Sequence, residues 1–84
     1  MSNKLDIDSA IKLIEGVNKN AEALISEKEK MRRAFENLGS SFKDMDYQEY
    51  ESQIDSIEKS MSTIISDLAN VASVLNAYVK SFNN

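Results

Sequence analysis

The second half of the chain carries an apolar or aromatic side chain at every position of a strict 3-4 spacing. The series runs without a gap through Tyr47, Tyr50, Ile54, Ile57, Met61, Ile64, Leu68, Val71, Leu75, Tyr78 and Phe82. This spacing averages 3.5 residues, the period at which one helix lays a continuous seam along another helix. The second half is therefore predicted to be one long helix that packs against other helices.

The first half repeats the same spacing, with one polar exception. Its apolar positions are Ile7, Ala10, Ile14, Val17, Ala21, Leu24, Met31, Phe35 and Leu38, and the exception is Lys28. A lysine in a seam can lay its methylene stem over apolar surface while its ammonium group stays in water. We expect Lys28 to do this without interrupting the helix.

A turn between the two seams predicts an all-α fold, an antiparallel two-helix hairpin. The 84 residues contain no proline, and Gly39 follows the last seam residue of the first half, where a left-handed C-terminal cap prefers glycine. Asp6 and Asp8 are candidate caps of the first helix, and Asp44 or Asp46 of the second. We predict a single hairpin over residues 1–84, with helices at about 7–38 and 46–82 and a turn at about 39–45.

Composition and charge argue against catalysis, metals and nucleic acid. The chain has no histidine and no cysteine, and Asp55, Glu58 and Asp67 are expected on solvated helix faces, so neither an enzyme nor a cofactor or metal site is predicted. The net charge is −4, and the basic cluster at 28–33 is interleaved with Glu27 and Glu29, which does not suit phosphate binding. No segment approaches a membrane span, and the first residues lack the apolar core of a secretory signal peptide.

Apolar residues outside the predicted seams gather at the end of the hairpin that carries the termini. We predict that they form a protein interface, through which the hairpin completes a four-helix bundle with a partner. The predicted interface residues are Ile11, Leu13, Ile65, Ala72, Val74 and Val79.

The residues around the turn resemble those of the WXG100 (ESAT-6-like) superfamily, whose members are two-helix hairpins of about this size. Phe42-Lys43-Asp44 occupies the place of that family's Trp-x-Gly or Trp-x-Asp turn, and Asp46 and the aromatic Tyr47 follow. The family's export signal, Tyr-x-x-x-Asp/Glu near the C-terminus, has no counterpart here, because Tyr78 is followed four residues later by Phe82. The chain is therefore most similar to the small helical partners of LXG-type toxins.

The resemblance implies an adaptor that brings a larger helical protein to a type VII secretion machine. The implied partner is the N-terminal helical domain of an LXG-type toxin or another WXG100-like subunit, and a homodimer is also open. It implies a cytoplasmic location before export, with the export signal supplied by the partner or by the turn. Phe42 is read either as a plug over the end of the core or as a contact to the secretion machine. The seam alone would also suit a generic coiled-coil assembly module.

Overall fold

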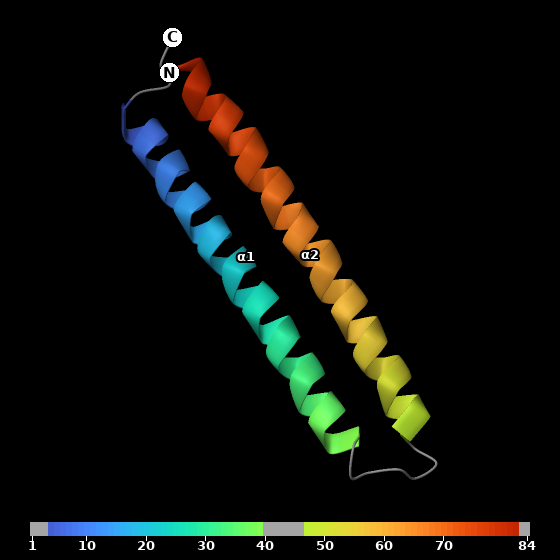
Figure 1. Cartoon of the computed structure of the whole chain (residues 1–84). Coiled ribbons are helices and arrows are strands. Elements are labelled where there is room, and N and C mark those ends of the chain that lie inside the picture. The colour runs from blue at the N-terminus through green and yellow to red at the C-terminus, as the bar shows by residue number, and fades with distance from the viewer. Residues whose placement is uncertain (1–3, 40–46, 83–84) are drawn as a thin grey trace.

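Two long helices lie side by side and antiparallel, as the sequence predicts. The computed structural model describes residues 4–39 and 47–82, which form α1 (Lys4–Gly39) and α2 (Tyr47–Ser81). The first residues of α1 lie beside the last residues of α2 (Figure 1), and the molecule measures 62 × 16 × 15 Å. The predicted all-α hairpin is confirmed.

The seam of α1 lies where the 3-4 spacing places it. Ala10, Val17 and Phe35 are buried, and the other seam positions from Ile7 to Met31 are half-buried, whereas Leu38 is exposed. Lys28 is also half-buried, and its Nζ donates a hydrogen bond to Ser62 Oγ of α2 at 3.1 Å. The lysine stem thus takes a place in the seam, and its ammonium group reaches the polar edge.

The seam of α2 differs from the predicted one in half of its positions. The column Tyr47, Ile54, Met61, Leu68 and Leu75 is half-buried, as expected. The second inward-facing column is Glu58, Ile65, Ala72 and Val79, of which Ala72 is buried and the other three are half-buried. The predicted column Tyr50, Ile57, Ile64, Val71 and Tyr78 is exposed. The prediction that Ile65, Ala72 and Val79 lie off the hairpin seam is therefore wrong. α2 keeps one predicted column in the seam and exchanges the other for the residues that follow it, which is a rotation of the helix by about 50°.

This rotation has an identifiable physical basis. The shared column has apolar neighbours on both sides, so periodicity permits either seam. In the observed seam, Phe35 stacks on Tyr47, with ring centroids 5.0 Å apart and planes at 15°. The small Ala72 is only 6% exposed, which indicates close packing of the helices there. The rotation also brings Glu58 to the basic residue Arg32 of α1.

The observed ends of the helices differ from several predictions made from capping residues. α1 begins at Lys4 rather than near residue 7, so Asp6 lies in its first turn instead of capping it. Gly39 is the last residue of α1, and no glycine among the described residues has a positive φ, so the predicted left-handed cap at Gly39 is wrong. α2 begins at Tyr47. Phe42, Asp44 and Asp46 of the predicted turn motif lie outside the described residues.

Gly39 is instead required by close packing between the two helices. A Cβ at this position would lie 2.5 Å from both Cε2 and Oη of Tyr47 and 2.8 Å from its Cζ. These distances are well inside van der Waals contact, so a side chain here would displace the Tyr47 ring. Glycine at the end of α1 thus makes room for the tyrosine that opens α2.

Candidate protein-interaction site

A prominent surface feature is an exposed apolar column along α2 that lies beside the hairpin seam. We call it the α2 stripe. It consists of Tyr50, Ile57, Ile64, Val71 and Tyr78. Each member is seven residues from the next, and their exposed fractions range from 40% at Tyr78 to 48% at Ile64. Large apolar side chains repeated along one helix face in this way are typical of a surface that another helix covers.

The side of the hairpin on which the α2 stripe lies follows from the cross-helix contacts. Positions directly after a seam residue and positions directly before one lie on opposite sides of the seam. Arg32 and Asp55 each come directly after a seam residue, and their ion pair lies on one side. Stripe residues come directly before a seam residue, as Leu13 comes before Ile14 in α1. In an antiparallel pair the preceding positions of both helices share the other side, so Leu13 lies on the same side as the stripe.

The structure separates the six predicted interface residues into two groups. Ile65, Ala72 and Val79 pack within the hairpin, whereas Ile11, Leu13 and Val74 are exposed, Val74 by 69%. Val74 adjoins the α2 stripe, and a shallow apolar depression is lined by Val71, Val74 and Leu75. Ile11 follows the seam residue Ala10, which places it on the side opposite Leu13. Leu13 and Val74 therefore extend the α2 stripe, and Ile11 does not.

Sequence reasoning included the stripe residues but assigned them to the wrong surface. The 3-4 pattern detects apolar columns, and it does not distinguish a seam within the hairpin from one between molecules. Glu58 argues from sequence against the observed seam, because it places a half-buried carboxylate there. Its pairing with Arg32, which makes that position tolerable, is a contact between residues far apart in sequence.

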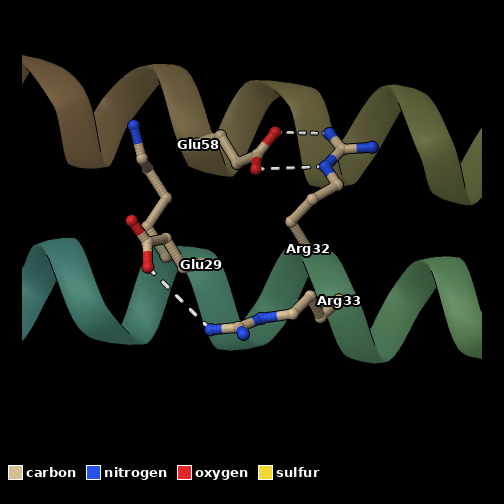
Figure 2. Close-up of a pocket in the computed structure, with 5 residues that line it drawn as sticks. Glu29, Arg32, Arg33 and Glu58 are labelled. Atoms are coloured by element: carbon tan, nitrogen blue, oxygen red, sulfur yellow. Dashed lines mark hydrogen bonds and ion pairs between the residues drawn. The ribbon is translucent and has the colours of Figure 1, made fainter.

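A polar cluster occupies the side of the hairpin opposite the α2 stripe. Arg32 reaches from α1 to α2, where its Nε donates to Glu58 Oε2 at 3.1 Å and its Nη2 donates to both Glu58 Oε1 and Asp55 Oδ1, the latter at 2.6 Å. Figure 2 shows the two parallel bonds between the guanidinium and Glu58. The Arg32 and Glu58 side chains are only 26% and 22% exposed. Glu58 is thus not the solvated carboxylate that the sequence predicts.

The same contacts set the electrostatics of the cluster. The hydrogen bonds from Arg32 lower the pKa of Glu58 against the opposing effect of partial desolvation, and the bonds from Glu58 and then Asp55 raise the pKa of Arg32. Arg32 also lies 6.0 Å from the ring centroid of Phe35. This bidentate clamp fixes the register of the two helices.

The remaining basic residues of the cluster pair within α1. Glu29 and Arg33 approach to 3.9 Å (Figure 2), and Glu27 and Lys30 to 3.7 Å. All four side chains are more than half exposed, so these pairs contribute little to stability. The predicted solvated face is confirmed for these four residues. Arg32 differs, because its side chain is mostly covered and reaches across to α2.

The described residues were compared with the needs of a metal site and of a membrane span. Across residues 4–39 and 47–82, no three side chains of the metal-binding types converge. Neither α1 nor α2 contains a stretch with the length and hydropathy to cross a bilayer. The α2 stripe, bordered by Leu13 and Val74, is therefore the surface whose chemistry indicates a use.

Comparison with family models, curated proteins and solved structures finds no match to this chain.

Proposed function

We propose that this hairpin is a helical adaptor that binds a helical segment of another protein along the α2 stripe. The observation that carries this proposal is the run of large apolar side chains at seven-residue intervals, each at least 40% exposed, on one face of α2. Such a face buries its apolar area when a partner helix lies along it, and two hairpins or two further helices would complete a four-helix bundle.

The resemblance of the turn to WXG100 proteins supports a more specific role. The proposed partner is the helical N-terminal domain of an LXG-type toxin, or a WXG100-like subunit, and the proposed process is type VII secretion. Adaptor and cargo would associate in the cytoplasm, and the partner would supply the acidic export signal that Tyr78–Phe82 lacks. A generic assembly module would use the same stripe without a link to secretion.

Pull-down with the N-terminal helical domain of an LXG-type toxin tests the proposal. Ile64→Asp introduces a charge at the centre of the α2 stripe and should abolish co-purification, because an ionised carboxylate in an apolar interface is strongly unfavourable. Ile25→Asp is the matched control. It replaces a similarly exposed isoleucine, 43% exposed, on the opposite side of the hairpin, and should bind as the unmodified chain does.

Secretion of the toxin provides the second measurement. Export should fall with Ile64→Asp and remain with Ile25→Asp. Normal toxin export from cells that lack this protein would refute the secretion role. Equal toxin binding by the two variants would refute the assignment of the surface.

A further inference from the structure

α2 carries two seams that share one apolar column, and α1 covers only one of them. Both seams use the column from Tyr47 to Leu75. The observed seam adds the column from Glu58 to Val79, whereas the alternative seam would add the α2 stripe. Turning α2 by about 50° around its own axis exchanges one seam for the other and leaves the hydrogen bonds within the helix intact.

Apolar burial by itself favours the alternative seam. The column from Glu58 to Val79 offers the hairpin two large aliphatic side chains, Ile65 and Val79, one alanine and one carboxylate. The α2 stripe offers five large side chains, each at least 40% exposed in the observed hairpin. Because hydrophobic stabilisation grows with the apolar area removed from water, contacts specific to the observed seam must offset this difference.

The polar contacts of Glu58 supply such an offset. Both oxygens of Glu58 accept hydrogen bonds from Arg32 (Figure 2), and the Arg32 and Glu58 side chains are only 26% and 22% exposed. Arg32 also donates to Asp55. Lys28 faces Glu58 too, but it lowers the pKa of Glu58 less than Arg32 does, and its Nζ donates to Ser62 Oγ.

The value of this clamp differs between the two seams. In the observed seam Glu58 is partly desolvated, so removal of Arg32 would leave a covered carboxylate without its main partner, which is strongly unfavourable. In the alternative seam Glu58 would lie at the solvated rim, where an ion pair contributes little. Arg32 therefore stabilises the observed seam much more than the alternative one.

We infer that the hairpin is a conformational switch in which the Arg32–Glu58 clamp holds the α2 stripe outside, and loss of the clamp lets α2 turn and pack the stripe against α1. Two packings of one sequence interconvert in this way when their free energies are close. The rotation is a property of the single chain. Its consequence, that the clamp controls whether a partner reaches the stripe, rests on the proposed function.

Cysteine cross-linking within the chain distinguishes the two seams, since the chain has no cysteine of its own. Lys28 and Glu58 line one depression across the seam. Ala21 lies seven residues before Lys28 and Ile65 lies seven after Glu58, so these two residues also share one level of the antiparallel pair. Ala21→Cys should link to Ile65→Cys more completely than to Ile64→Cys, because a disulfide needs Cβ atoms about 3.5–4.5 Å apart.

Removal of the clamp should reverse this order. Arg32→Met keeps a long side chain at the position and leaves Glu58 without its main partner. In this background the cysteine pair with Ile64→Cys should become the more completely linked one. Arg33→Met is the matched control, since Arg33 is an exposed arginine whose ion pair lies within α1, and it should leave the order unchanged.

Melting temperatures provide a second readout that needs no cysteine. In the unmodified background, Ile65→Asp should lower the melting temperature more than Ile64→Asp does, because Ile65 packs against α1. In the Arg32→Met background the larger fall should belong to Ile64→Asp, which would then place its charge in the seam.

Each result decides the inference. An unchanged order in either measurement would overturn the rotation, and so would loss of helix content in Arg32→Met alone, because a chain with a second seam should keep its helices. Toxin-domain binding is measured separately. An unmodified chain that does not bind refutes the proposed function and leaves the rotation to the cross-links. If the unmodified chain binds, Arg32→Met should bind more weakly than Arg33→Met, and equal binding would overturn control of the stripe by the clamp.

Discussion

At the scale of single residues, Arg32 is the side chain that joins the two helices by charge. It donates to Glu58 through Nε and Nη2 and to Asp55 through Nη2. Surface pairs such as Glu29–Arg33 link neighbouring turns of one helix and do not affect how the two helices are oriented. The Arg32–Glu58 pair does constrain the rotation of α2, because it forms in one rotational setting and is lost when α2 turns by one residue.

The lowered pKa of Glu58 predicts an acid-dependent stability. A carboxylate whose folded-state pKa lies below its unfolded value, about 4.3, stabilises the fold above that value and loses this contribution as the pH falls through the folded-state pKa. Glu58→Gln removes this titration while keeping a similar shape. The melting temperature of the unmodified chain should exceed that of Glu58→Gln at neutral pH, and the difference should vanish below the folded-state pKa.

Thermal melts of both proteins across the acid range measure this difference. The other carboxylates titrate in both chains, so the difference isolates Glu58. A gap between the two melting temperatures that is constant with pH would contradict the assigned role of the Arg32–Glu58 bonds.

The two glycines predict opposite responses to alanine. Gly16 has open space around its Cβ position, so Gly16→Ala should raise the free energy of unfolding by about 1 kcal/mol through helix propensity. Gly39→Ala should instead lower it by about 1 kcal/mol, because the Tyr47 ring must leave its stack on Phe35. Denaturant unfolding measures both changes.

The double variant Gly39→Ala with Tyr47→Ala provides the control. With the ring removed, alanine at position 39 should no longer be destabilising relative to glycine. If Gly39→Ala stabilises the chain as Gly16→Ala does, the packing of Gly39 against Tyr47 is wrong.

At the scale of elements, α2 carries two overlapping apolar faces and uses them differently. The column from Tyr47 to Leu75 packs against α1. Of the two columns beside it, the one with Ile65 completes the seam and the one with Ile64 stays exposed. Consecutive residues therefore have different surroundings. Ile65 is half-buried against α1, whereas Ile64 is 48% exposed in the α2 stripe.

This difference predicts distinct effects for the same substitution at adjacent positions. Ile65→Asp should destabilise the hairpin by at least about 2 kcal/mol, the lower end for losing a buried isoleucine, because it also introduces a charge into the seam. Ile64→Asp should leave the helix content of the hairpin intact and weaken association. Circular dichroism for helix content and light scattering for mass would distinguish them, and equal helix loss in both variants would contradict the rotation of α2.

At the scale of the whole molecule, the hairpin has a thin core for its length. The buried apolar residues in the described part of the chain are Ala10, Val17, Phe35 and Ala72, and no side chain there is fully enclosed. The radius of gyration is 18.9 Å. A compact chain of this length would have a radius of about 12 Å. Much of the apolar surface that two long helices could bury thus stays on the outside, at the α2 stripe.

Association along the α2 stripe should therefore appear in the thermal stability. The melting temperature of the unmodified chain should rise when a helical partner domain is added in excess, because a partner that binds only the folded state stabilises it. That of Ile64→Asp should not change. Melts over a hundredfold range of partner concentration measure the effect, and a melting temperature of the unmodified chain that does not depend on the partner would contradict binding along the α2 stripe.

The sequence by itself determined the two helices, their approximate ends and the seam of α1. These features depend on local physics, since the 3-4 spacing and the absence of proline act within a few turns of one helix. The half-buried place of Lys28 followed from the same reasoning, because a lysine stem tolerates an apolar seam wherever its ammonium group can reach an edge.

Only the tertiary structure decided which face of α2 meets α1. Ile64 and Ile65 are equally apolar and adjacent, so periodicity cannot rank them. The choice depends on contacts between residues far apart in sequence, namely Phe35 with Tyr47 and Arg32 with Glu58. The same choice determined the candidate site, because whichever column α1 leaves uncovered becomes the surface available to a partner.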